Sequence, residues 1–514
     1  MKIKLTKITS LLITFILVCS IFAVMPTEVS AVNDDLASVS SNNGTSVGDE
    51  AAISDFIYTV NDDGTATITK YNGNDALLVI PNEIDGHTVT AIGRAAFSGC
   101  TSLTSITIPD SVTSIGYIAF SDCTSLSSIE ISDSVTEIGM SAFFGCTNLS
   151  SIKIPGGVTE IDRMTFSGCT NLASVIIPGG VTSIGYSAFS DCTNLTGITI
   201  PDSVTTIASV AFVNCTSLGS ITIPDSVTYI GKAALPGCTN INVADNNQNY
   251  CDIDGVLFSK DKTVLIQYPG GRTSESYSIP DSVTYIDESA FSNCTGLASI
   301  IIPGGVTSIG ESAFSDCTSL VSINVADNNQ VYCDIDGVLF NKDKTEIIIY
   351  PTGKPSARYS IPDGVTSIGD YAFFDCTSLS SIEIPDSVTE IGSQAFLDCT
   401  GLVYIRIPTG VREIGWKAFD KCDKLTIYGY SGSYVQTYAN SNNIPFVEIT
   451  NNLGDVNLDG RITISDVTLI QKYLTGYCSL NSEQLKLADY NEDGMITISD
   501  ATLIQKSIAK KAKN

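Results

Sequence analysis

The feature that most constrains this chain is a 23-residue repeat that runs through most of its 514 residues. Cysteine, phenylalanine and proline each recur in a column at this spacing. A fixed period of about 20 to 50 residues is typical of a solenoid, whose repeats bury their apolar faces only against their neighbours. The sequence therefore predicts stacked coils. The cysteine column is Cys100, Cys123, Cys146, Cys169, Cys192, Cys215, Cys238, Cys294, Cys317, Cys376, Cys399 and Cys422.

One repeat, residues 103–125, contains a short strand. Ile106 and Ile108 alternate with Ser105 and Thr107, so one face of this strand is apolar, and Pro109 then ends it. Stacking such strands about 4.8 Å apart gives a parallel sheet on one side, with turns or short helices on the other. Each phenylalanine of its column should then pack on the next.

Two near-identical insertions interrupt the period. They begin at Asn242 and Asn324, 82 residues apart. In the first, apolar residues 255–258 and 264–266 flank the turn-prone residues 259–262, and an equivalent pair surrounds residues 341–344. Each insertion is predicted to form a hairpin.

The ends of the repeat region need caps. Residues 56–68 place Asn61 to Gly64 between alternating residues, which predicts a hairpin that closes the first repeat, and residues 428–447 should close the last. Residues 32–54 are rich in Ser, Asn, Asp and Gly and are expected to be a linker. A second junction is expected at residues 451–454.

The repeat run I-x-I-P-x-x-V-x-x-I-G-x-x-A-F-x-x-C-x-x-L resembles the BspA-like leucine-rich repeat of bacterial surface proteins. The resemblance covers residues 56–447 and recurs about a dozen times. It implies an α/β repeat fold, a leucine-rich-repeat solenoid with a parallel sheet and two hairpin insertions. We place this solenoid, with its end caps, at residues 55–450.

The N-terminus has the pattern of a secretory signal peptide at residues 1–31. Lysines at positions 2, 4 and 7 precede an apolar run over residues 11–24, and Val29-Ser30-Ala31 is a small-residue cleavage site. A lipid anchor at Cys19 is the competing interpretation, but Val18 is larger than a lipoprotein signal requires. No other segment is long and apolar enough to span a bilayer. We expect a secreted, extracellular protein.

The charge of the chain limits its partners. The net charge is −28, so the surface repels nucleic acid phosphates and anionic lipids and attracts cations. Calcium is one such cation.

Two twelve-residue stretches, 455–466 and 489–500, carry the pattern of calcium-binding loops. Each has oxygen-bearing side chains at loop positions 1, 3, 5, 9 and 12 and glycine at position 6. They lie 34 residues apart and precede nearly the same helical sequence. They predict two Ca²⁺ ions in a small duplicated module.

Residues 454–510 resemble a type I dockerin, the calcium-dependent domain that binds exported proteins to cohesin domains of cellulosome scaffolds. The resemblance implies a small all-α module, a cohesin partner and a role in polysaccharide catabolism. Helices 467–474 and 501–508 would present the cohesin-facing surface. Aspartate at loop position 12, where an ordinary EF-hand has Glu, is itself dockerin-like. The implied ligands are Asp455, Asn457, Asp459, Thr463 and Asp466 with the Arg461 carbonyl, then Asp489, Asn491, Asp493, Thr497 and Asp500 with the Met495 carbonyl.

By the same resemblance, partner choice depends on loop positions 10 and 11 and on helix positions 17 and 18. The two copies are identical there, which would let the module dock in either of two orientations. The residues are Ile464, Ser465, Gln471 and Lys472 in the first copy and Ile498, Ser499, Gln505 and Lys506 in the second.

The cysteine column allows stacked disulfides, a metal ladder or simple packing. Equivalent thiols that point the same way would pair arbitrarily, and the chain has one histidine and no Cys-x-x-Cys. We favour reduced, buried cysteines that pack as small apolar side chains. Cys251, Cys333 and Cys478 are thiols outside the column to which the sequence assigns no role.

The sequence shows no catalytic constellation. His87 is the only histidine, and it lies in a capping segment without a serine or cysteine motif beside it. Acidic residues such as Asp110 and Asp202 recur at one repeat position, which is typical of turn formers. We predict a non-catalytic protein. The alternative is a cellulosomal enzyme that acts on plant polysaccharide with an unrecognised active site.

Two sets of repeat positions are expected to be exposed. The outward strand positions are mostly small and polar, and Tyr404 is the one aromatic residue among them, which argues against sugar stacking on this sheet. A second position varies freely, through either recognition or neutral drift. It holds Arg94, Tyr117, Met140, Arg163, Tyr186, Ser209, Lys232 and Trp416. A protein or cell-surface ligand is the expected partner of the solenoid.

Overall fold

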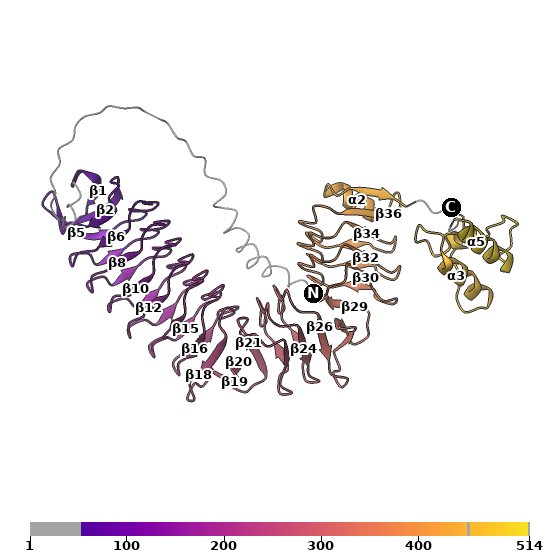
Figure 1. Ribbon diagram of the computed structural model, residues 1–514, viewed down its shortest axis with the longest axis horizontal. Coiled ribbons are helices and arrows are strands. Elements are labelled where there is room, and N and C mark those ends of the chain that lie inside the picture. The colour runs from indigo at the N-terminus through magenta and orange to yellow at the C-terminus, as the bar shows by residue number, and fades with distance from the viewer. Residues whose placement is uncertain (1–52, 450–452, 512–514) are drawn as a thin grey trace, which may run out of the picture. The chain divides into compact units, whose positions relative to one another are not determined.

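The computed structural model describes residues 53–449 and 453–511. The signal peptide expected at residues 1–31 and most of the linker expected at 32–54 lie outside these residues. Residues 53–449 form stacked coils of short strands, and residues 453–511 form a small helical module (Figure 1). Within the described part of the chain, no helix has the length and apolar character needed to cross a bilayer.

The first strand of each coil follows the predicted alternation. Ser105 pairs with Ser128 and Ile106 with Ile129, so parallel neighbours are in register at one repeat. Ile106 is buried, while Ser128 and Glu130 on the next strand face outward. The strands of this column are β3 (Leu77–Val79), β6 (Ser105–Thr107), β8 (Ser128–Glu130), β10 (Ser151–Lys153), β12 (Ser174–Ile176), β14 (Gly197–Ile198), β16 (Ser220–Ile223), β18 (Asn240–Val243), β22 (Ser276–Ser278), β24 (Ser299–Ile302), β26 (Ser322–Val325), β30 (Arg358–Ser360), β32 (Ser381–Glu383) and β34 (Tyr404–Arg406).

Each coil also contributes a second, shorter strand that the sequence did not indicate. In residues 112–115, Val112 and Ile115 are buried and lie three positions apart, a spacing that does not alternate as a strand should. The strands of this column pair in parallel and are β5 (His87–Ile92), β7 (Ser114–Ile115), β9 (Glu137–Ile138), β11 (Glu160–Ile161), β13 (Ser183–Ile184), β15 (Thr206–Ile207), β17 (Tyr229–Ile230), β23 (Tyr285–Ile286), β25 (Ser308–Ile309), β31 (Ser367–Ile368), β33 (Glu390–Ile391) and β35 (Glu413–Ile414).

The rest of each coil is a series of turns rather than helices. Hydrogen bonds between coils continue through these turns: the Phe120 N–H donates to the Ala142 carbonyl at 2.8 Å, and the Ile118 N–H to the Met140 carbonyl at 3.1 Å. Ile118 has φ 47°, a left-handed conformation that is rare for a β-branched residue. The turn therefore tolerates local strain because its backbone polar groups are paired with the next coil.

The phenylalanine column forms the predicted stack. Neighbouring rings from Phe97 to Phe212 are nearly parallel, with centroids 5.1 to 5.5 Å apart. The column cysteines from Cys123 to Cys422 are buried beside them, as expected for packing residues, whereas Cys100 in the first coil is half-buried. The interior is thus a set of side-chain ladders that extend from coil to coil.

The two insertions form the predicted antiparallel hairpins, and each has a further strand in front. In the first, β19 (Tyr250–Ile253) pairs with β20 (Val256–Ser259), which pairs with β21 (Val264–Gln267). In the second, β27 (Tyr332–Ile335), β28 (Val338–Asn341) and β29 (Glu346–Ile349) repeat this arrangement. β21 and β29 then pair in parallel with the second strand column, so each insertion is built into the solenoid.

Both ends of the solenoid are capped as expected. At the N-terminal end, β1 (Phe56–Val60) and β2 (Ala66–Tyr71) form an antiparallel hairpin after the 3-10 helix η1 (Ile53–Asp55). Gly64 in its turn has φ 83°, and β4 (Glu83–Ile84) forms a further hairpin with β5. At the C-terminal end, β36 (Thr426–Gly429), α2 (Tyr434–Ser441) and β37 (Phe446–Glu448) cover the last coil.

The C-terminal module contains α3 (Ile464–Leu474), α4 (Ser482–Ala488) and α5 (Ile498–Lys511). Its core includes Val467 and Ile470 of α3 and Ala501 and Ile504 of α5. These pairs are 34 residues apart, so the duplicated sequence packs against itself.

Candidate functional site: two aspartate loops and a paired helical face

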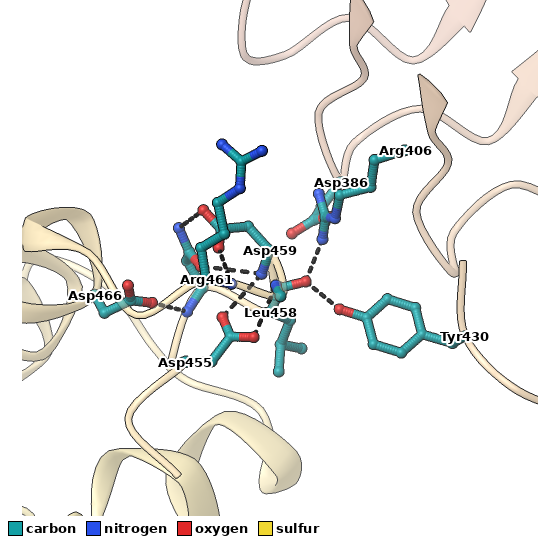
Figure 2. A network of polar contacts seen from close by, with 10 residues as sticks. Asp386, Arg406, Tyr430, Asp455, Leu458, Asp459, Arg461 and Asp466 are labelled. Carbon is teal, nitrogen blue, oxygen red and sulfur yellow. Dashed lines mark hydrogen bonds and ion pairs between the residues drawn. The ribbon is translucent and has the colours of Figure 1, made fainter. Parts of the chain in front are cut away.

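The first loop is closed by its own carboxylates. The Asp455 carboxylate accepts hydrogen bonds from the N–H groups of Asp459 at 3.0 Å and Gly460 at 2.7 Å. Asp466 accepts from the N–H groups of Asn457 at 2.9 Å and Thr463 at 2.7 Å. Figure 2 shows Asp455, Asp459 and Asp466 around this loop. The side chains at positions 1, 5 and 12 are therefore gathered by the backbone between them.

Glycine at loop position 6 makes this closure possible. Gly460 has φ 76°, a conformation that other residues rarely adopt, and it turns its N–H toward Asp455. Asn457 Nδ2 donates to the Asp459 carboxylate at 2.9 Å, which adds the position 3 side chain to the group.

The second loop repeats these contacts. The Asp489 carboxylate accepts from the Asp493 N–H at 3.0 Å and from the Gly494 N–H at 2.8 Å, and Gly494 has φ 84°. Asp500 accepts from the N–H groups of Asn491 at 3.2 Å and Thr497 at 2.9 Å. The sequence duplication is therefore also a duplication of geometry.

The first loop concentrates negative charge in a shielded place. Burial, followed by the nearby charges of Asp459 and Asp466, raises the pKa of Asp455 to about 6. Burial likewise raises the pKa of Asp466. Because neither carboxylate has a cationic side chain as an ion-pair partner in the described residues, a bound cation would relieve their repulsion.

The donor chemistry of the loops fits calcium better than a transition metal. Among the described residues, no three His, Cys, Asp or Glu side chains are arranged as a metal-binding group. Here the loop carboxylates face N–H donors, and the remaining predicted ligands are an amide, a hydroxyl and a main-chain carbonyl, which that criterion does not count. Ca²⁺ prefers such oxygen ligands in a flexible shell. The residues present therefore suit this ion.

The helices that follow the loops begin earlier than the sequence suggested. We expected residues 467–474 and 501–508, but α3 begins at Ile464 and α5 at Ile498 and continues to Lys511. The reason at α3 is a capping box: the Thr463 hydroxyl accepts from the backbone of the first turn, while Asp466 accepts from the Thr463 N–H. Loop position 12 is therefore also part of the helix start.

The predicted partner-facing residues are all exposed. Ile464 retains 58% of its accessible surface and Ile498 retains 60%, which is unusual for isoleucine. The other six, Ser465, Gln471, Lys472, Ser499, Gln505 and Lys506, are also exposed. The structure therefore leaves both copies of the face available to a partner.

The solenoid candidates for catalysis have structural explanations. His87 lies on β5, where Nδ1 is 2.8 Å from the Gly64 carbonyl oxygen of the capping hairpin. Burial, and then neighbouring aspartates, raises the pKa of Asp375, but Asp316 and Asp375 both hold left-handed turn positions at φ 58° and 54°. Aspartate tolerates this conformation well, so these residues serve as turn formers.

The outward strand face contains one aromatic contact that the sequence did not reveal. Tyr428 of β36 lies beside Tyr404 of β34, with ring centroids 4.7 Å apart. The sequence assigned residues 428–447 to the cap, so Tyr428 was not counted as a strand residue. The variable position is exposed or half-buried in every coil where it was identified.

The coil geometry and the paired loops define a leucine-rich-repeat solenoid with a calcium-loop module of the dockerin class. Residues 79–196, 159–274, 270–352 and 355–459 match the BspA type leucine rich repeat region, and the chain belongs to this family. Residues 453–509 match the dockerin type I domain, a calcium-binding module that implies a cohesin partner. No curated protein sequence matches the chain significantly.

Solved structures of bacterial leucine-rich repeat proteins resemble the solenoid. A leucine rich cell surface protein from Faecalibacterium prausnitzii is 35% identical, with a TM-score of 0.52 over 78% of this chain and 97% of that one. A leucine-rich repeat protein from Bacteroides ovatus is 28% identical, with a TM-score of 0.35 over 77% and 98% of the two chains. The pneumococcal vaccine antigen PcpA is 21% identical, with a TM-score of 0.45 over 77% and 97%.

Proposed function

We propose that this protein is a secreted, non-catalytic accessory protein that binds cohesin through residues 454–510 and presents residues 55–450 as a recognition surface. In this proposal residues 1–31 direct export and residues 32–54 are a linker. The complex it joins is a cellulosome-like assembly that degrades polysaccharide.

The observation that carries this proposal is the match between the two halves of the module. Each half has a closed aspartate loop, a helix that starts inside that loop and an exposed Ile-Ser and Gln-Lys set. A calcium-dependent docking module requires such a coupling, because ion binding in the loop then fixes the start of the helix that meets the partner.

In each loop the proposed calcium ligands are the side chains at positions 1, 3, 5, 9 and 12 and the carbonyl at position 7. Two ions would bind. Their positive charge would compensate the carboxylates, whose repulsion otherwise opposes loop closure. The ligands are those already given for the first loop, Asp455 to Asp466, and for the second, Asp489 to Asp500.

The solenoid is proposed to bind a protein or a cell-surface component. Its support is the family resemblance to a bacterial cell surface protein together with the long rows of exposed polar strand residues. Solenoids of this kind offer extended surfaces to partners.

The test is a binding assay of the chain from residue 32 onward against immobilised cohesin. Calcium should support binding, and a chelator should abolish both binding and the helical circular dichroism signal of the module. The double variant Asp455→Ala/Asp489→Ala should behave like the chelated protein, whereas Asp423→Ala, an exposed acid on the solenoid, should bind normally. A chelated module that remains folded and bound would contradict the proposal.

The non-catalytic part has its own test. The same protein, incubated with plant polysaccharides, should release no reducing ends above the buffer control. Steady release would favour the alternative of a cellulosomal enzyme, whatever the outcome of the cohesin assay.

A further inference from the structure

A column of large side chains follows one edge of the N-terminal coils. It consists of Arg94, Tyr117, Met140, Arg163 and Tyr186, which occupy one position in five consecutive coils. Both arginines are exposed, and the other three are half-buried. We call this set the arginine–tyrosine column.

The column contains the same pair twice. The guanidinium carbon of Arg94 lies 4.9 Å from the ring centroid of Tyr117, and that of Arg163 lies 5.2 Å from the ring centroid of Tyr186. Both distances are within the range of a cation–π contact. The contact holds each guanidinium group in place, so a ligand that binds it loses less side-chain entropy.

The spacing of the two pairs follows from the fold. Arg94 and Arg163 are three coils apart, which corresponds to roughly 15 Å at the strand spacing of a sheet. The column is one side chain wide and extends along the stacking direction. Its shape therefore suits an extended segment better than a broad globular face.

The two guanidinium groups lack an anionic partner. In the described residues, neither Arg94 nor Arg163 forms an ion pair or a side-chain hydrogen bond. The nearest acid in sequence, Asp162, uses its carboxylate to accept the Arg163 backbone N–H. In a chain with a net charge of −28, two uncompensated cations on one edge favour an anionic ligand.

The composition of the column points to a protein. Tyrosine, methionine and arginine are the residues enriched at protein interfaces, whereas lysine and small polar residues are depleted there. Met140 lies between the two pairs and can adapt to an apolar side chain.

The same edge changes sign further along the solenoid. Glu288, Glu311 and Asp370 follow Ile-Asp or Ile-Gly at the equivalent position of later coils, and Lys232 forms an ion pair with Glu288. An anionic ligand would be repelled beyond this point. The coils from Arg94 to Tyr186 thus limit where such a ligand can lie.

We propose that the arginine–tyrosine column binds an extended acidic segment of a partner protein. Two carboxylates of the segment would pair with Arg94 and Arg163, and its apolar side chains would pack on Tyr117, Met140 and Tyr186. This inference rests on the proposed recognition role of the solenoid and names the partner class. It does not depend on cohesin docking.

The test uses a fluorescein-labelled twelve-residue peptide of alternating Glu and Leu, titrated with the chain from residue 32 onward and followed by anisotropy. Arg94→Glu/Arg163→Glu should weaken binding about tenfold or more, since each charge pair contributes on the order of 1 kcal/mol or more when partly shielded. The matched control is Arg358→Glu/Arg412→Glu, two exposed arginines elsewhere on the solenoid, which should change affinity less than about twofold.

Several results would overturn the proposal. These are equal losses in the two double variants, equally tight binding of a Lys-Leu peptide, or no binding of the Glu-Leu peptide by the unmodified protein. Polygalacturonate that binds more tightly than the peptide, and in a manner sensitive to the same arginines, would assign the column to an acidic polysaccharide instead. Circular dichroism and cohesin binding, measured on each variant, separate a failure of this column from a failure of folding or docking.

Discussion

The Cys169 thiol donates a hydrogen bond to the carbonyl oxygen of Phe143, which belongs to the preceding coil, at 3.1 Å. The same contact occurs in eight coils, always over 26 residues and at 2.9 to 3.2 Å. The cysteine column is therefore more than a column of small apolar side chains, because each thiol also satisfies a buried backbone acceptor.

Replacement of one ladder thiol should destabilise the solenoid modestly. We expect Cys169→Ala to lower the free energy of unfolding by about 1 to 2 kcal/mol, through a lost hydrogen bond and a small cavity. Cys100→Ala is the control, because the Cys100 thiol is half-buried. Urea unfolding followed by circular dichroism measures both. Equal effects would show that the contact with the Phe143 carbonyl contributes nothing.

The oxidation state of the ladder can be read from thiol reactivity. Burial raises the pKa of Cys123 to about 12, so the buried thiols should not react with Ellman's reagent in the native protein. Cys100, Cys251, Cys333 and Cys478 are half-buried and should react. In denaturant, all fifteen thiols from residue 32 onward should react. A smaller number would indicate disulfides between coils.

The phenylalanine stack should be sensitive to truncation. Phe166 is fully buried between Phe143 and Phe189, so Phe166→Ala should cost about 3 to 5 kcal/mol. Phe166→Leu is the matched control, because Leu235 occupies the same column naturally, and it should cost clearly less. Thermal unfolding of both variants checks the order. Since coils contact only their neighbours, the loss should appear as partial unfolding near the site.

Acid should stabilise the calcium-free module. The pKa of Asp455 is raised in the folded state to about 6, so between about pH 4 and 6 the folded state binds more protons than the unfolded state. Stability without calcium should therefore fall as the pH rises through this range, while the stabilisation gained from calcium should increase. Melting of the chain from residue 32 onward at several pH values, with and without chelator, measures this. Asp455→Asn should remove most of the pH dependence, and an unchanged profile would assign it to other groups.

The duplicated docking face predicts redundancy. Gln471→Ala/Lys472→Ala alone should leave cohesin affinity within about twofold, because the second copy can still dock. The combination with Gln505→Ala/Lys506→Ala should weaken binding far more than either pair alone. Surface plasmon resonance on immobilised cohesin distinguishes these cases. If one pair alone abolishes binding, the module docks in a single orientation.

The sequence predicted the parts of the fold that repeat as simple patterns. The alternation at Ile106 and Ile108 predicted the first strand column, and the phenylalanine spacing predicted the ring stack. The second strand column was missed because Val112 and Ile115 are three positions apart. The left-handed turn at Ile118 was equally hidden, since it conflicts with local preference and is stabilised by hydrogen bonds to the next coil.

The candidate site was predictable to a similar degree. Loop positions and exposed helix residues follow from the twelve-residue pattern and the dockerin resemblance. The helix starts at Ile464 and Ile498 were missed because the loop and the helix share Asp466 and Asp500. The Arg–Tyr contacts follow from side-chain conformation, which a repeat spacing does not specify.

The two hairpin insertions have a consequence for the length of the solenoid. Asn242 and Asn324 hold the same register on β18 and β26, each paired in parallel with the strand before it. Removal of residues 242–323 would join Ile241 directly to Asn324 and leave every remaining strand with an equivalent neighbour. The block between the insertions is in this sense a removable cassette, and the reach of the protein can change by whole blocks without a new fold.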